Sequence, residues 1–422
     1  MRMNRGFYTI MAAQFFSSLA DNALLIAAIA LLAEMHSPEW MTPLLKLSFG
    51  VSYVLLAAFV GAFADALPKG RVMFVTNLVK IFGCGLMFVD LHPLVAYGIV
   101  GLGAAAYSPA KYGILTELLP AEKLVAANGW IEGLTVTSII LGAVLGGALV
   151  NPVVSAALLS FDMPMVETGV DTPVKAALCV ITTLYLLAAA FNLKIPTTGA
   201  HYPSQERHPW RLIKDFSRCY TSLWQDKLGQ ISLGVTTLFW GAGATLQFIV
   251  LKWAENSLNL PLDRAAILQG VVAFGVAIGA IAAARFVPLK KSLGVMPLGV
   301  IMGLMVMSMT LIHTIWIAYP LLITIGALSG YFVVPMNALL QHRGHVLMSA
   351  GHSIAVQNFN EQISVLGMLL LYALMIRLEM NVNYVIILFG LFVAGMMLVM
   401  MQKHRANQRE FDSLALIGEH KH

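Results

Sequence analysis

Twelve long apolar runs dominate this sequence, and they limit what it can fold into. Each run holds about 20–27 residues, which at 1.5 Å per residue lets an α-helix cross a hydrocarbon core about 30 Å thick. Only 11% of the 422 residues are charged and 59% are hydrophobic, whereas soluble domains have about 25% charged residues. The composition therefore predicts an all-α membrane protein and excludes a soluble fold.

The runs give the expected membrane spans directly. They are 7–33, 44–66, 72–90, 93–119, 127–150, 173–193, 229–254, 263–287, 293–312, 315–341, 350–376 and 381–402. The first run is too long for a cleavable signal peptide, and Asp21 and Asn22 interrupt it, so we expect it to remain as a span. Lysines and arginines gather in alternate connections, which by the positive-inside rule predicts that both termini are cytoplasmic.

Two pairs of landmarks indicate that the chain is a duplication. The segment 107–111, which contains Pro109 and Lys111, matches 333–337, and Leu141-Gly142 matches Leu366-Gly367 at nearly the same spacing. Parallel repeats of six helices are common in transporters. We therefore expect an N-terminal six-helix bundle at 1–193, a partly amphipathic cytoplasmic linker at 194–228, a C-terminal six-helix bundle at 229–402 and a cytoplasmic tail at 403–422.

A short motif follows the second run and contains Gly61, Asp65, Gly70 and Arg71. It resembles the cytoplasmic loop motif of the major facilitator superfamily, which governs gating, although two extra residues stand between Asp65 and Gly70. We expect Gly61 to allow close helix contact, Asp65 to pair with an arginine or a facing helix N-terminus, Gly70 to permit the turn, and Arg71 to anchor the loop. An ordinary turn with cytoplasmic positive charges is the alternative.

Glycines in the fifth run form a second motif. Gly142, Gly146 and Gly147 would place small residues on one helix face, which favours close packing against a neighbouring helix. We expect this packing role. The motif also resembles a truncated form of the glycine-rich motif of antiporters in the major facilitator superfamily, so a role in coupling is the alternative.

Polar residues inside the runs are the candidate functional residues, because a charge there costs at least ~2.5–3.5 kcal/mol. The expected translocation set is Asp21, Asn22, Lys111, Gln247, Asn337, Asn358 and Glu361. Its carboxylates would take a cation, and Lys111 would take a phosphate. In the alternative, Asp21 and Lys111 form a gating salt bridge without a ligand.

Further polar residues lie in the same runs, among them Gln14 in the first run. Gln357 and Asn360 share the eleventh run with Glu361. We interpret Lys80 and Glu132 as gating residues or as side chains that snorkel to the membrane surface.

Motifs of other protein classes do not occur. The sequence has no nucleotide-binding glycine loop, no acyltransferase His/Asp spacing and no metal-spaced histidines, and its three cysteines form no disulfide framework. We therefore expect no enzyme activity, no metal and no cofactor. The formal charge of +5 is explained by membrane orientation and by anionic membrane lipids, without nucleic acid.

Five segments, at 15–25, 105–115, 238–246, 332–341 and 355–361, resemble the bacterial lysophospholipid transporter family. That resemblance implies the major facilitator superfamily fold with 12 transmembrane helices. It implies flipping of lysophospholipids, chiefly lysophosphatidylethanolamine, across the bacterial inner membrane. It also implies a separate cytoplasmic acyltransferase/acyl-carrier-protein synthetase as partner.

The resemblance extends to particular residues. Asp21, Asn22, Lys111 and Glu361 match the family pattern, whereas Gln247 replaces an arginine. The alternative function is a proton-coupled facilitator-type carrier of another amphiphile, a drug or a small solute. A membrane acyltransferase or a scaffold is a third possibility, and the missing His/Asp spacing argues against the acyltransferase.

Overall fold

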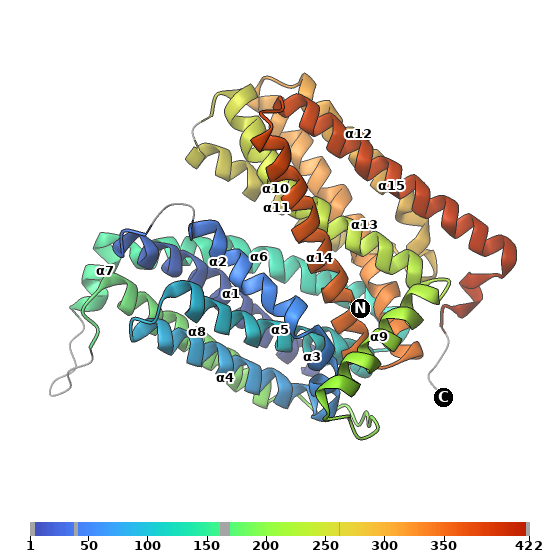
Figure 1. The fold of residues 1–422 in the computed structure, drawn as a ribbon, viewed down its shortest axis with the longest axis horizontal. Helices are drawn as coiled ribbons and strands as arrows, with labels where there is room; N and C mark the ends of the chain where they lie inside the picture. Colours follow the sequence, from blue (N-terminus) through green and yellow to red (C-terminus); the bar gives the residue numbers. More distant parts are fainter. Residues whose placement is uncertain (1–4, 38–40, 161–168, 261, 419–422) are drawn as a thin grey trace. The chain divides into compact units, whose positions relative to one another are not determined.

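We describe a computed structural model of the chain over residues 5–37, 41–160, 169–260 and 262–418. Within these residues the secondary structure is entirely helical (Figure 1). The α-helices are α1 (Arg5–Glu34), α2 (Met41–Leu55), α3 (Ala57–Ala66), α4 (Lys69–Phe88), α5 (Pro93–Leu118), α6 (Leu124–Val150), α7 (Pro152–Leu159), α8 (Pro173–Leu193), α9 (Pro209–Gln225), α10 (Gly229–Leu258), α11 (Leu262–Phe286), α12 (Met296–Ser308), α13 (Ile315–Leu347), α14 (Ala350–Arg377) and α15 (Val382–Glu410). Short 3₁₀ helices are η1 (Ala121–Lys123), η2 (Leu289–Val295), η3 (Met309–Leu311) and η4 (Ser413–Leu416).

The number of spans agrees with the sequence. In the described residues, 11 helices are long and apolar enough to cross a membrane, and the pair α2 and α3 makes a twelfth if its 67° bend lies within one span. The predicted all-α membrane class is therefore confirmed. The break falls at Leu56, where neither proline nor glycine is present, so nothing in the local sequence predicts it.

Some helical segments lie outside the expected spans. The helix α15 continues to Glu410, past the expected end at 402. The helix α7 adds two turns after α6, and the Asn151 side chain accepts a hydrogen bond from the Val153 backbone N–H at its start. An asparagine followed by proline is a strong helix start.

The helix α9 lies in the linker stretch and has two different sides. Its apolar side packs into a cluster in which Leu223 is fully buried, together with Phe216 and Tyr220. Both of these rings contact Phe359 of α14. Arg211 and Arg218 on its other side are exposed.

Contacts divide the chain into two compact units. Unit 1 holds the residues up to Ile114 and Thr137–Leu212, and unit 2 holds Leu115–Val136 and Ile213 onward. The first turns of α6 thus pack within unit 2, where the amides of Asn128 and Gln341 exchange two hydrogen bonds of 2.9 Å. The expected division at 193/194 and 228/229, and the cytoplasmic side of the linker and tail, stay predictions.

Each unit has its own apolar core. In unit 1, α1 and α4 both pack against α8 (Figure 1), and Leu24, Tyr97 and Ile181 are among the buried residues. In unit 2, Trp253 is fully buried and its indole N–H donates to the Met309 carbonyl at 2.8 Å. Because the helices of each core fix one another, polar side chains on them are held in defined positions.

Candidate functional site

The polar cluster of unit 1 is centred on Asp21, which lies in the middle of α1. One carboxylate oxygen accepts a hydrogen bond from the Lys80 ammonium of α4 at 2.8 Å, and the other accepts from the Tyr185 hydroxyl of α8 at 2.6 Å. The Lys80 side chain is 2% exposed and the Asp21 side chain 20% exposed. Three helices therefore meet at one ion pair.

Further groups hold Lys80 in place. Its ammonium donates to the Ser17 hydroxyl at 3.0 Å, and Ser17 donates to Asn77 at 2.8 Å. The Tyr107 ring lies 4.9 Å from the same ammonium, which suits a cation–π contact. A Cβ atom on Gly103 of α5 would lie 2.8 Å from the Lys80 side chain, so this glycine lets α5 approach α4.

This pairing corrects two expectations. Asp21 pairs with Lys80 and Tyr185, so the Asp21–Lys111 salt bridge considered from the sequence is wrong. Lys80 does not snorkel, because it turns into the bundle toward an opposite charge. Ser17 and Asp21 are four residues apart, and Asn77 and Lys80 three apart, so each pair shares a helix face. That matching of two polar faces was the signal that sequence reasoning missed.

The remaining expected residues of unit 1 lie on α1 and α5. Lys111 follows Pro109 inside α5, and its ammonium is 4.3 Å from the centre of the Tyr112 ring. The Asn22 amide donates to the Ser18 carbonyl one turn earlier at 2.8 Å.

The glycine motif of α6 packs against α1. A Cβ on Gly142 would lie 2.6 Å from the Asn22 Cβ, and one on Gly146 would lie 2.7 Å from the Ile26 Cβ. The predicted packing role is confirmed for these two glycines. It is wrong for Gly147, which faces open space.

The polar cluster of unit 2 joins α13 and α14. The Gln357 amide nitrogen donates to the Asn337 side-chain oxygen at 3.1 Å and to a Glu361 carboxylate oxygen at 2.7 Å. All three residues are at most 9% exposed. The structure thus brings together Asn337 and Glu361 of the expected set, and adds Gln357 as the residue that links them.

Two expected residues of unit 2 lie apart from this link. Gln247 is exposed on α10 and exchanges hydrogen bonds of 3.0 and 3.1 Å with Gln269 of α11. These bonds join α10 to α11, and the role of Gln247 in translocation stays a prediction. Asn358 is half-buried on α14, next to Gln357 in sequence.

The loop motif of unit 1 is a buried ion pair. The Lys69 ammonium lies 2.5 Å from an Asp65 oxygen and 2.8 Å from the Ala64 carbonyl, and the ring of Tyr202 lies 5.0 Å away. A lysine, which the sequence analysis did not consider, thus pairs with Asp65, because α4 begins at Lys69 and places this lysine over the last turn of α3.

Other motif residues also differ from expectation. Gly70 is helical in the first turn of α4, and a Cβ there would lie 3.1 Å from the Asn192 carbonyl. Its role is therefore close approach to α8, and the expected role in the turn is wrong. Gly61 is buried in α3, and Arg71 is exposed. Glu132 is 4% exposed, so snorkelling is wrong for this residue.

Charged contacts also lie outside the spanning helices. Glu206 accepts hydrogen bonds from the backbone N–H groups of His208 and Arg207 and from the Arg211 guanidinium. These donors, in that order of importance, lower the pKa of Glu206 from 4.5 to about 2. Glu206 therefore stabilises the start of α9 as an anion.

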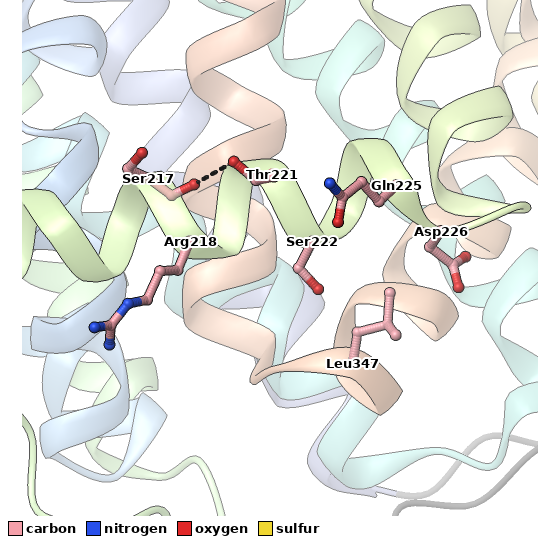
Figure 2. A pocket seen from close by; sticks show the side chains of 7 residues that line it. All are labelled: Ser217, Arg218, Thr221, Ser222, Gln225, Asp226 and Leu347. Atoms are coloured by element: carbon pink, nitrogen blue, oxygen red, sulfur yellow. Dashed lines mark hydrogen bonds between the residues drawn. The ribbon is translucent and has the colours of Figure 1, made fainter.

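A polar pocket of about 530 Å³ lies along α9 in unit 2. Figure 2 shows its lining: Ser217, Arg218, Thr221, Ser222, Gln225, Asp226 and Leu347. Asp226 also holds the Arg343 guanidinium through two hydrogen bonds of 2.6 and 3.1 Å. None of the expected translocation residues lines this pocket, so we do not place the cargo there.

The chain is similar in sequence to known membrane transporters. The profile of the Major Facilitator Superfamily matches residues 10–364. A protein called lysophospholipid transporter LplT, from Yersinia pestis strain Pestoides F, is 42% identical over 378 residues, which are 89% of this chain and 88% of the relative. The protein of the same name from Yersinia pseudotuberculosis serotype I matches equally well.

Solved structures show the fold. The transporter FucP in its outward conformation matches with a TM-score of 0.71 at 14% identity, covering 95% of this chain and 98% of FucP. The human organic anion transporter MFSD10 matches with a TM-score of 0.72 at 13% identity, covering 95% of this chain and 100% of MFSD10. The predicted fold class is therefore confirmed.

Proposed function

Because this chain belongs to the Major Facilitator Superfamily, and is thus a multi-pass membrane transporter and not an enzyme, we propose that its cargo is a lysophospholipid. The observation that carries the proposal is the 42% identity over 89% of the chain to proteins called lysophospholipid transporters. In the proposal, lysophosphatidylethanolamine and related lysolipids cross the bacterial inner membrane to its cytoplasmic leaflet. A separate acyltransferase/acyl-carrier-protein synthetase would then restore the missing acyl chain.

The proposed cargo contacts are the residues expected from the sequence. They are Asp21, Asn22 and Lys111 in unit 1 and Gln247, Asn337, Asn358 and Glu361 in unit 2. Charges and amides inside apolar helices support this assignment, because such groups are costly unless they are paired or serve a polar cargo. We assign gating to Gly61, Asp65, Gly70, Arg71 and Glu132, of which Asp65 and Glu132 are buried charges.

The direct test uses the purified chain in lipid vesicles with labelled lysophosphatidylethanolamine. The chain should accelerate its movement between leaflets, and Lys111→Ala should lower the rate about tenfold, because one charge-assisted contact to phosphate is lost. Lys290→Ala, at an exposed lysine of η2, is the matched control and should leave the rate unchanged. If lysophosphatidylethanolamine moved between the leaflets no faster than in vesicles without the protein, the proposal would be refuted.

Proton coupling is the second candidate, because the spanning helices carry the carboxylates Asp21 and Glu361. A protonophore distinguishes the two. Uptake that stops when the proton gradient is removed favours a coupled carrier, and uptake that persists favours passive flipping.

A further inference from the structure

Gln357 carries a hydrogen-bond acceptor that the described protein does not use. Its amide nitrogen has two hydrogens, and both are engaged, one with Asn337 and one with Glu361. Its side-chain oxygen is buried and has no partner among the described residues, while the residue as a whole is 6% exposed. A buried acceptor without a donor is unusual and destabilising, so it calls for an explanation.

The orientation of this amide is fixed by its neighbours. The nitrogen faces an Asn337 oxygen and a Glu361 carboxylate oxygen. If the amide were turned over, its oxygen would face the carboxylate, and two acceptors would repel each other. The unpartnered atom is therefore the carbonyl oxygen.

An uncharged donor suits this oxygen best. An ammonium group would prefer the Glu361 carboxylate, because a hydrogen bond between two charged groups is stronger than one to a neutral amide. A hydroxyl suits the neutral carbonyl oxygen better. Every lysophospholipid has one free glycerol hydroxyl, whereas both glycerol positions of a diacyl phospholipid are esterified and donate nothing.

We propose that Gln357 accepts a hydrogen bond from the free glycerol hydroxyl of the cargo and so distinguishes a lysophospholipid from the diacyl lipids of the bilayer. This inference rests on the proposed function and deepens it. A site with a buried acceptor rejects a cargo that lacks the matching donor, because the acceptor would remain unpaired. Asn337 and Glu361, besides their proposed contacts with the cargo, also hold the amide in position.

The test compares lysophosphatidylethanolamine with an analogue that has hydrogen in place of the free hydroxyl and therefore adds no bulk. With the full chain in vesicles, the KM for the lysolipid should lie about 10- to 100-fold below that for the deoxy analogue. In Gln357→Met the KM for the lysolipid should rise to that of the analogue, so that the ratio falls to about one.

The ratio of the KM for the deoxy analogue to the KM for the lysolipid distinguishes direct recognition of the hydroxyl by Gln357 from a purely structural role of this residue. Damage to the fold would change both KM values together and leave their ratio unchanged, and this result in Gln357→Met would overturn the inference. Gln341→Met is the matched control, because the Gln341 amide is buried but exchanges both of its bonds with Asn128. It should keep the wild-type ratio.

Two further arms complete the test. Lysophosphatidylmethanol has no donor in its headgroup, and it should show the same hydroxyl ratio; loss of that ratio would assign the donor to the amine and overturn the inference. Equal KM values for the lysolipid and its deoxy analogue in the wild-type chain would also overturn it, even if Gln357→Met failed to fold. A wild-type chain that moves neither lipid would instead refute the proposed function.

Discussion

The two units differ in the partners that surround a carboxylate inside the apolar helices. In unit 1 the carboxylate of Asp21 has a cation, Lys80, at 2.8 Å and a tyrosine hydroxyl at 2.6 Å. In unit 2 the carboxylate of Glu361 is bonded by the Gln357 amide, whose own oxygen has no donor among the described residues. The first cluster contains an ion pair, and the second contains an amide oxygen with no donor among the described residues.

The two units also differ in packing at positions that the sequence repeat relates. Gly142 of unit 1 lies against α1, whereas Gly367 of unit 2 has open space where a Cβ would stand. Lys111 of unit 1 corresponds to Asn337 of unit 2. Helices at related positions in the two units therefore make different contacts. The sequence repeat predicts where a helix lies in the fold better than it predicts which residues that helix contacts.

The largest expected effect comes from breaking the ion pair of unit 1. Asp21→Asn leaves the Lys80 ammonium without its counter-charge, and we expect a loss of about 3–5 kcal/mol in the free energy of unfolding. Glu361→Gln should cost only about 1 kcal/mol, because the new side chain keeps an oxygen for the Gln357 amide. Thermal unfolding of the detergent-solubilised chains measures both.

A double variant is the control for this comparison. Asp21→Asn with Lys80→Met removes both charges and should recover most of the stability lost in Asp21→Asn. Equal losses for Asp21→Asn and Glu361→Gln would show that the two clusters do not differ in the way described.

A smaller effect should separate the two glycines. Gly142→Ala forces α6 away from α1 and should cost about 1–3 kcal/mol. Gly367→Ala meets no neighbour and should gain up to about 1 kcal/mol through helix propensity. Unfolding in a denaturant gradient would show opposite shifts of the midpoint, and shifts of one sign would contradict the difference in packing.

The smallest effect concerns a charge outside both clusters, at Glu206. Its pKa in the folded chain is about 2, below the ordinary 4.5, so its ionised form is favoured by folding. The stabilisation is therefore present above pH 4.5 and is lost as the pH falls toward 2. Hydrogen exchange of the amides of Arg207 and His208 should be slower than in Glu206→Gln at neutral pH, and the difference should vanish in acid. A difference that persists in acid would contradict the assignment.

The contacts of Asp21 show how much of the candidate site could be predicted from the sequence. A carboxylate at this depth of an apolar run predicts a partner or a cargo, and that prediction needs only the cost of burying charge. The choice of Lys80 over Lys111 needs the packing of α1, α4 and α8. The same holds for Asp65, whose partner Lys69 depends on where α4 begins.

The sequence by itself determined that the chain spans a membrane, how many spans it has and which family it resembles. Those properties follow from run length, composition and local motifs, all of which can be identified from the order of the residues without knowledge of the packing. Tertiary structure alone decided that Lys80 neutralises Asp21 and that Gln357 joins Asn337 to Glu361 while leaving its oxygen unused. The Lys80–Asp21 bond joins helices that are far apart in sequence, and the Gln357–Asn337 bond joins two consecutive helices. The geometry of both bonds exists only once the helices have packed.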